Sequence, residues 1–360
     1  NYKDAIKCYK KAITINPNFS EAHNNLGNVF KDIGELDRAI NSYQKAIKLN
    51  SDFAEAYYNL GNAFKKLNQK QKALLFFEKA GAINPKIDFI LGDILTARMQ
   101  FCDWTDYSIS LESLESKIVV NEKVVDPFNL LGLIDNPALQ KIAAQIFSNY
   151  HCSTKQTFEK SNLSPKNSKI RIGYFSADFH NHATMHLMAE LFECHDKNFF
   201  ELVAFSFGPD QVDSWRKKVL ASFDKFIDVR LKTDQEVSVM ARKLKIDIAV
   251  DLKGYTKDCR PNIFAKICAP VQVSYLGYPG TMGADYIHYL IADQTLIPEF
   301  NQHHYTEKII FMPNSYQVNG SKRDITKAAL LREDFGLPDK GFIFCCFNNT
   351  YKITPPTFSS

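Results

Sequence analysis

A 34-residue period dominates the first quarter of the chain. Residues 21–54 align with residues 55–88 along their whole length, and Leu26-Gly27 recurs as Leu60-Gly61. Small residues at fixed phases of such a period are typical of tetratricopeptide repeats, in which each unit is a pair of helices. One unit cannot bury its apolar face alone. The repeat therefore predicts an α-solenoid over residues 1–100, with a partial first repeat and a last helix that acts as a cap.

Five asparagines fall on the first helices of these repeats, which line the groove of such arrays. Asparagine amides can pair with the backbone of an extended polypeptide whatever its side chains are. We therefore expect the groove to bind peptides or partner proteins, and a surface for packing within the array or for homo-oligomer formation is the alternative use of the repeats. An ordinary solvated helix surface is the alternative. The asparagines are Asn24, Asn25, Asn28, Asn59 and Asn62.

The composition of the 360 residues excludes several classes of protein. Hydrophobic residues make up 45% and aromatic residues 13%, which is incompatible with intrinsic disorder. A formal charge of +4 from 44 basic and 40 acidic residues gives no support for nucleic-acid or membrane-surface binding. No apolar run reaches the roughly 18 residues of a spanning helix. Eight cysteines without a CxxC pair argue against a zinc ribbon and favour reduced thiols in a cytoplasmic protein.

The pattern changes twice after the repeats. Residues 101–168 are irregular and are expected to form a helical linker that ends in an exposed connector at 161–168. Short apolar runs then alternate with helical patterns over 169–325, which predicts a Rossmann-like α/β lobe with a parallel sheet covered by helices. The predicted strands are 170–176, 202–207, 247–252, 271–276, 289–293 and 308–312.

A second α/β lobe is expected to start at 326–360. A helix pattern at 331–335 stops at Gly336 and is followed by an apolar run, Phe342–Phe347, of strand length. The chain also begins without Met, inside a helical pattern, and stops soon after this run. We therefore expect a fragment in which the second lobe is truncated.

Ligands of parallel α/β sheets bind beyond the carboxyl ends of the strands. The loop after the first predicted strand contains His180, His182 and His186. The last two have the i,i+4 spacing of helical zinc ligands, but no HExxH glutamate is present. A general acid/base or substrate-orienting role for one histidine is therefore favoured over a metal site, and a structural role is the remaining alternative.

Glycine-bearing loops follow the strands at 247–252 and 271–276. Lys253-Gly254-Tyr255-Thr256 and the segment 277–283 permit tight turns and close backbone approach to a ligand. Backbone N–H groups and a Thr hydroxyl suit sugar or phosphate oxygens. Neither loop matches GxGxxG or a Walker motif, and simple turns are the alternative. Lys352, just beyond the last predicted strand, is either placed to neutralise a phosphate or is a surface lysine.

Four stretches of the chain resemble the O-linked N-acetylglucosamine transferases, including bacterial relatives and plant Spindly-type proteins. The resemblance implies a GT-B glycosyltransferase, with a nucleotide-sugar between two Rossmann-like lobes, that inverts the anomeric centre and needs no metal. It also implies UDP-N-acetylglucosamine as donor, without a further cofactor, and Ser/Thr hydroxyls of proteins as acceptors. The stretches are IRIGYFSADFHNHATMHLM (170–188), the LGYPGT-containing segment 251–294, YTEKIIFMPNSY (305–316) and GFIFCCFNNTYKI (341–353).

The resemblance implies roles for individual residues. His182 corresponds to the family's active-site histidine, although Ala183 follows it where animal members have Pro. Lys352 corresponds to the lysine that contacts the donor diphosphate, and Asn349 stands where animal members have Gln. The implied donor-binding residues are Thr256, Gly277, Pro279, Gly280, Thr281, Asn349 and Lys352.

Two other functions are compatible with the same stretches. One is a Spindly-like protein O-fucosyltransferase that uses GDP-fucose. The other is a repeat-based adaptor whose transferase domain is inert, although the presence of His182, Thr256 and Lys352 argues against inertness. Because the second lobe supplies most of the nucleotide pocket in this family, the fragment alone is expected to be inactive.

Overall fold

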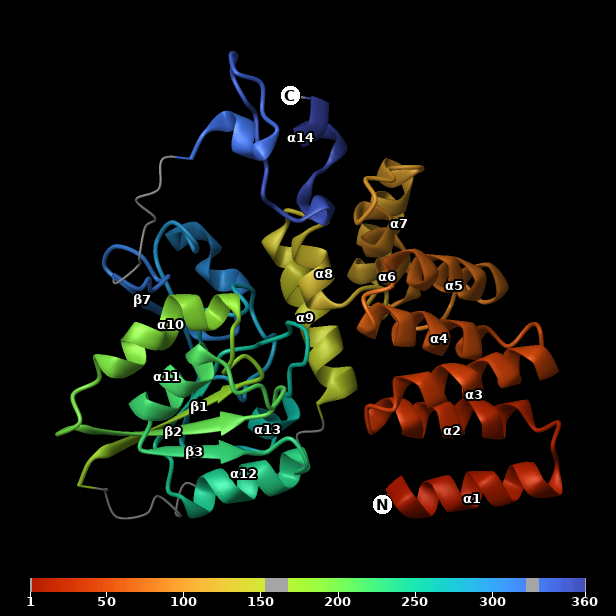
Figure 1. Cartoon of the computed structure of the whole chain (residues 1–360), viewed down its shortest axis with the longest axis horizontal. Coiled ribbons are helices and arrows are strands. Elements are labelled where there is room, and N and C mark those ends of the chain that lie inside the picture. The colour runs from red at the N-terminus through yellow and green to blue at the C-terminus, as the bar shows by residue number, and fades with distance from the viewer. Residues whose placement is uncertain (1, 153–167, 322–329, 360) are drawn as a thin grey trace. The chain divides into compact units, whose positions relative to one another are not determined.

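The computed structural model describes residues 2–152, 168–321 and 330–359 (Figure 1). The chain forms two compact units: a repeat unit, Asn1–Leu139 with Asn348–Ser360, and a sheet unit, Gln140–Phe347. The connector predicted at 161–168 lies outside the described residues except for Ser168, and so does the boundary predicted at residue 325. None of the helices in the described ranges is long and apolar enough to cross a membrane.

The array of helices at the start of the repeat unit confirms the predicted α-solenoid. Glycines at one phase of the repeat set how closely its helices approach, since a Cβ on Gly27 would lie 2.6 Å from the Tyr43 ring. The equivalent Cβ on Gly61 would lie 2.6 Å from the Phe77 ring. The same glycine–aromatic pair therefore recurs in each repeat. The helices of the array are α1 (Tyr2–Ile15), α2 (Ser20–Asp32), α3 (Leu36–Leu49), α4 (Ala54–Lys66), α5 (Lys70–Ile83) and α6 (Ile90–Met99).

A buried carboxylate ties the last helix of the array to α4. Asp93 on α6 accepts a hydrogen bond from the Tyr58 hydroxyl at 2.8 Å and one from Lys65 Nζ at 2.8 Å. Burial is the largest cause that raises the pKa of Tyr58, and the charge of Asp93 is the next. The helix predicted as a cap is therefore held to the repeats by polar contacts as well as by apolar packing. The helices α7 (Tyr107–Val119) and α8 (Pro127–Leu131) follow it.

The strand predicted at Phe342–Phe347 is wrong. The segment is irregular, and the side chains of Phe342, Phe344 and Phe347 are 82%, 90% and 98% exposed. A strand needs a neighbour for its backbone groups and an apolar layer for one face, and the described residues offer this segment neither. The expected second sheet is therefore not formed within those residues. The helix expected before it is the short 3₁₀ helix η3 (Arg332–Phe335), which ends at Gly336 with φ 63°.

The residues that follow this segment pack in the repeat unit. Thr350 Oγ1 donates a hydrogen bond to the Gln100 carbonyl at 2.8 Å. A Cβ on Gly132 would meet the Tyr351 ring at 3.4 Å. These contacts fix η4 (Thr350–Lys352) against the end of the array, and α14 (Pro355–Ser359) follows it.

The sheet unit contains a seven-stranded parallel sheet, which confirms the predicted α/β architecture. Ile172 and Tyr174 of the first strand belong to the core formed with α10 and α11, which lie over the strands in Figure 1. Phe175 faces the other way, and its ring centroid lies 5.2 Å from that of Phe264 on α13. Both faces of the sheet are therefore covered, as parallel sheets require.

The sheet has the order β3-β2-β1-β4-β5-β6-β7. Its strands are β1 (Ile170–Ser176), β2 (Phe200–Ser206), β3 (Lys225–Asp228), β4 (Ile248–Asp251), β5 (Val271–Ser274), β6 (Tyr289–Ala292) and β7 (Lys308–Phe311). The helices of this part are α9 (Pro137–His151), α10 (Ala183–Glu193), α11 (Ser214–Ser222), α12 (Asp234–Lys243), α13 (Asn262–Ala265) and the 3₁₀ helix η2 (Glu299–His304).

The order of the strands reverses between β1 and β4. Strands β2 and β3 lie on one side of β1, whereas β4 to β7 lie on the other. Phe175 of β1 pairs with Asp251 of β4, so the loops after these two strands leave the sheet side by side. Open α/β sheets bind their ligands at such a reversal.

Candidate functional site

A buried ion pair joins the two loops at the reversal of strand order. Lys253 Nζ lies 2.8 Å and 3.0 Å from the two carboxylate oxygens of Asp178. The two side chains are only 6% and 8% exposed. This pair is not predicted from the sequence. The available signal was one charged residue two positions beyond each of two apolar strands.

His182 is oriented by this pair and by the start of α10. Its Nδ1 accepts a hydrogen bond from the Thr184 backbone N–H at 3.2 Å and lies 3.1 Å from Thr184 Oγ1. The same nitrogen lies 3.6 Å from Asp178 Oδ2. Among the described residues, none bonds to Nε2, and the His182 side chain is 42% exposed.

The geometry of His182 allows the ring to hold or accept a proton. With Nδ1 unprotonated, the ring caps the helix through the Thr184 N–H. With Nδ1 protonated, that proton faces the Thr184 hydroxyl and the Asp178 carboxylate, and Nε2 is left to accept a proton from a ligand. A positive imidazolium would be stabilised by the carboxylate behind it.

The pKa of His182 is expected to lie below 6.5 in the folded chain. Burial is the largest cause and lowers the pKa, Asp178 raises it, and the charges of Lys253, His180 and His186 lower it further. An NMR titration of the ring should therefore give a midpoint below 6.5, with the signal assigned through His182→Ala. Asp178→Asn should lower the midpoint further because the raising charge is lost. A midpoint at or above 6.5 in the unmodified chain would contradict this electrostatic account.

The other two histidines of the loop have different surroundings. His186 Nε2 lies 2.8 Å from Asn181 Oδ1, and its ring centroid lies 4.1 Å from that of Trp215, with the two rings tilted at 42°. His180 Nδ1 is buried and has no hydrogen-bond partner within the described parts of the chain, and its ring centroid lies 5.8 Å from that of His182. An unpaired buried nitrogen at this place would be satisfied by a bound polar group. In the described ranges, no cluster of three or more His, Cys, Asp or Glu side chains is arranged to hold a metal ion.

The two glycine-bearing loops pack against each other as one body. A Cβ on Gly277 would lie 2.0 Å from the Leu252 carbonyl oxygen, so the backbones of the loops after β4 and β5 touch. Gly254 has φ +52°, in the left-handed region that favours glycine. Tyr255 adds a hydrogen bond from its hydroxyl to the Met282 carbonyl at 2.6 Å.

The hydroxyls of both predicted donor-binding threonines are used within these loops. Thr256 Oγ1 donates to the Lys253 carbonyl at 2.8 Å. Thr281 is 4% exposed, and its Oγ1 donates to the Glu307 carboxylate at 2.7 Å. Burial raises the pKa of Glu307. Gly277, Pro279 and Gly280 lie in the same loop as Thr281, and their role in donor binding stays a prediction.

Asp251, at the end of β4, is a further group at this edge of the sheet. It accepts a hydrogen bond from the Lys253 backbone N–H at 2.9 Å, and burial raises its pKa to about 6. Asp247 lies at the opposite end of the strand, where its carboxylate accepts from the Arg171 N–H at 2.8 Å. Only Asp251 therefore belongs to the neighbourhood of the Asp178–Lys253 pair.

The structure places Asn349 and Lys352 in the repeat unit, not in the sheet unit that holds His182. Lys352 is exposed at the end of η4, and its backbone N–H bonds to the Asn349 carbonyl at 3.0 Å. Their contact with a donor therefore stays a prediction.

The asparagines predicted to line the groove are partly engaged with one another and with the array. Asn59 Nδ2 donates to Asn24 Oδ1 at 3.0 Å, which links α4 to α2. Asn28 Oδ1 accepts from the Tyr43 hydroxyl at 2.8 Å. Asn24 is buried, whereas Asn25 and Asn62 are half-buried on the same two helices. Peptide binding by this set stays a prediction.

Models of known families match most of the chain. The model described as Glycosyl transferase family 41 matches residues 101–330. Models of the TPR repeat match residues 1–34 and 27–68, and a tetratricopeptide repeat model matches residues 54–87. The matches therefore cover both the repeats and the sheet.

Curated relatives and a solved structure agree with these matches. The SEC protein of Arabidopsis thaliana, described as a probable UDP-N-acetylglucosamine–peptide N-acetylglucosaminyltransferase, is 35% identical over 71% of this chain and 28% of its own length. The Caenorhabditis elegans UDP-N-acetylglucosamine–peptide N-acetylglucosaminyltransferase is 30% identical over 60% of this chain and 20% of its own length.

The solved structure is a mutant of the Thermobaculum terrenum O-GlcNAc transferase. It aligns with a TM-score of 0.54 and 24% identity over 87% of this chain and 54% of that one, which is a likeness of fold. The chain spans less than a third of the length of each of these two curated relatives. Because the family 41 model covers more than half of the chain, these 360 residues belong to glycosyl transferase family 41.

Proposed function

We propose that the protein containing these residues is an inverting glycosyltransferase that moves N-acetylglucosamine from UDP-N-acetylglucosamine to Ser/Thr hydroxyls of proteins. The observation that carries the proposal is His182 held against the Asp178–Lys253 pair at the strand-order reversal of a family 41 sheet. The names of the relatives support this donor and a peptide acceptor.

The reaction requires one bond to form and one to break at the sugar C1. The acceptor hydroxyl oxygen attacks C1, and the bond from C1 to the diphosphate oxygen breaks, with its electron pair leaving on UDP. The hydroxyl proton is transferred to a base, for which we propose His182 Nε2. Asp178 faces the other ring nitrogen and would stabilise the imidazolium that forms. His182 as a substrate-positioning group is the fallback role.

Stabilisation of the leaving group is assigned by resemblance. Lys352 would offset the negative charge that grows on the diphosphate, so that no metal ion is needed. Contacts to the donor are proposed for Asn349 and for the loops that contain Thr256 and Gly277–Thr281. Both threonine hydroxyls already donate hydrogen bonds within these loops. We therefore favour backbone N–H groups as the groups that donate hydrogen bonds to the nucleotide-sugar.

The repeat array is proposed to bind the acceptor polypeptide. Tetratricopeptide repeats present an extended surface, and half-buried amides such as those of Asn25 and Asn62 suit a polypeptide backbone. This contact would select proteins as acceptors without fixing their sequence.

A transfer assay on the full-length protein tests the function. Acceptor proteins are incubated with radiolabelled UDP-N-acetylglucosamine or GDP-fucose, with and without EDTA. We expect incorporation of N-acetylglucosamine that survives chelation. His182→Ala should lower the rate by about 10²-fold or more, as loss of a general base does. His186→Ala, one turn further along α10, is the matched control and should leave the rate within a few-fold of the unmodified protein.

The other outcomes separate the rival functions. Transfer from GDP-fucose alone would support a Spindly-like protein O-fucosyltransferase, the second candidate. No transfer from either donor by a folded full-length protein would support an adaptor with an inert domain. Full activity of Lys352→Ala would contradict the role proposed for that lysine.

A further inference from the structure

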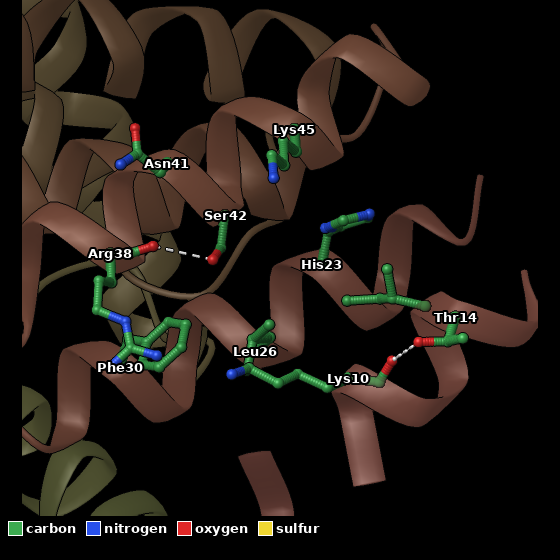
Figure 2. A pocket seen from close by; sticks show the side chains of 10 residues that line it. Lys10, Thr14, His23, Leu26, Phe30, Arg38, Asn41, Ser42 and Lys45 are labelled. Atoms are coloured by element: carbon green, nitrogen blue, oxygen red, sulfur yellow. Dashed lines mark hydrogen bonds between the residues drawn. The ribbon is translucent and has the colours of Figure 1, made fainter. Parts of the chain in front are cut away.

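A pocket of about 450 Å³ lies between the first three helices of the repeat unit (Figure 2). Its floor is apolar and comes from Leu26 and Phe30 of α2, which are buried. His23 and Ser42 form two of its walls, and both are also buried. The rim contains exposed cationic side chains from α1 and α3.

The repeat itself explains why the pocket is there. In the next repeat, 34 residues on, Tyr57 stands at the phase of His23, and Phe76 stands at the phase of Ser42. The ring of Phe76 stacks on the ring of Phe64 at 5.4 Å and on that of Tyr57 at 6.3 Å. An aromatic stack therefore fills the space between α4 and α5, the second junction. At the first junction, between α2 and α3, His23 stands in place of Tyr57 and no ring stands in place of Phe76.

The cations at the two junctions differ in what they cover. Lys79 lies 5.9 Å from the ring centroids of both Tyr57 and Phe76. Its phase equivalent in the first junction is Lys45, which lines the pocket. Among the described residues, neither Lys45 nor Lys10 forms an ion pair.

The third cation of the rim is already partly engaged. Arg38 lies 3.9 Å from the Phe30 ring centroid and forms an ion pair with Glu35. No Asp or Glu lines the pocket, so two lysines leave its rim positively charged.

We propose that this pocket binds an aromatic side chain of a partner protein, presented by a segment with acidic residues beside the aromatic one. The ring would occupy the place that Phe76 fills in the next repeat, stacked on Phe30 and below Lys45. The neighbouring carboxylates would pair with Lys10 and Lys45. The site lies within the repeat unit and does not depend on whether the protein transfers a sugar.

The side chains that line the pocket favour an aromatic residue in an acidic segment. An aromatic ring on Phe30 reproduces the stacked pair seen at the next junction, and Lys45 would lie near that ring as Lys79 lies near Phe76, which adds a cation–π contact. Unpaired surface lysines attract acidic segments and raise their rate of encounter. A basic or purely aliphatic segment would satisfy neither feature.

Fluorescence anisotropy with the 360-residue chain tests the proposal. The probe is a labelled peptide with one Phe flanked on each side by two Glu in a Gly/Ser context. We expect saturable binding that weakens by at least ~10-fold when the Phe of the peptide is replaced by Ala, since burial of that ring is lost. Ser42→Phe in the protein should weaken binding by at least ~10-fold. The new side chain would fill the pocket in the way that Phe76 fills the equivalent space in the next repeat.

Two further variants keep the test decisive. His23→Tyr should also weaken binding, since the larger ring on α2 fills the pocket as Tyr57 does in the next repeat. This variant tests the proposal if Ser42→Phe does not fold. Leu75→Phe adds an exposed aromatic residue on α5, outside the pocket, and should bind as the unmodified chain does. Unchanged binding by both pocket-filling variants would overturn the proposal. Equal binding of the Phe and Ala peptides would also overturn it, because charge attraction alone would then explain the affinity.

Discussion

Replacing Lys253 with Met is expected to destabilise the sheet unit by about 3–5 kcal/mol. The change removes the cation that lies 2.8 Å from the Asp178 carboxylate and leaves that buried carboxylate without a permanent positive charge beside it. The free energy of unfolding in urea measures the effect. Trp215 lies on α11 in the sheet unit, so its fluorescence in a Trp104→Phe background reports on this unit.

The double variant Asp178→Asn with Lys253→Met is the matched control. The amide carries no charge and still accepts a hydrogen bond from Thr184 Oγ1, which lies 3.3 Å from the carboxylate in the unmodified chain. It should therefore be more stable than Lys253→Met alone, as buried ion pairs replaced on both sides usually are. Equal loss in the single and double variants would mean that the uncompensated carboxylate is not the cause.

Gly277→Ala should destabilise the same unit by about 3 kcal/mol, the upper end of the usual cost of overpacking. The new Cβ would lie 2.0 Å from the Leu252 carbonyl oxygen, and a backbone atom cannot rotate away as a side chain can. The two glycine-bearing loops would have to separate. Urea unfolding followed through Trp215 measures the loss.

Gly320→Ala is the control for Gly277→Ala. A Cβ at position 320 would meet its nearest atom, Glu190 Oε2, at 3.5 Å, which is ordinary van der Waals contact. Its effect should stay below about 1 kcal/mol. Comparable losses from the two substitutions would show that the close approach of the loops does not govern stability here.

Local patterns in the sequence predicted most of the elements. The period of 34 residues located the repeat helices because each repeat must present the same small residues to its neighbour. The pattern of Ile170–Ser176 predicts the bounds that β1 has, since its last five residues are buried, as in a strand covered on both faces. Strand β3 has no such run: its two end residues at the sheet edge are exposed and charged, and only its two central residues are half-buried.

Local pattern predicts the wrong structure at the apolar run near the end of the chain. Phe342–Phe347 has the composition of a buried strand, but a strand forms only when a neighbour accepts its backbone hydrogen bonds. In the described residues no neighbour does so. Apolar composition thus predicts where a strand can form, whereas pairing decides whether it does.

The sequence by itself determined the repeat array, the parallel sheet and the loops at its carboxyl edge, because periodicity and burial of apolar residues are local properties of a chain. The sequence also shows that Ser42 and Phe76 occupy equivalent positions in successive repeats. The folded structure is needed to show that Lys253 pairs with Asp178, 75 residues away, that Thr281 donates to Glu307, and that Ser42, in place of a ring, leaves an open pocket. These features depend on distances between segments remote in the chain, which the packing of the sheet and of the helices sets.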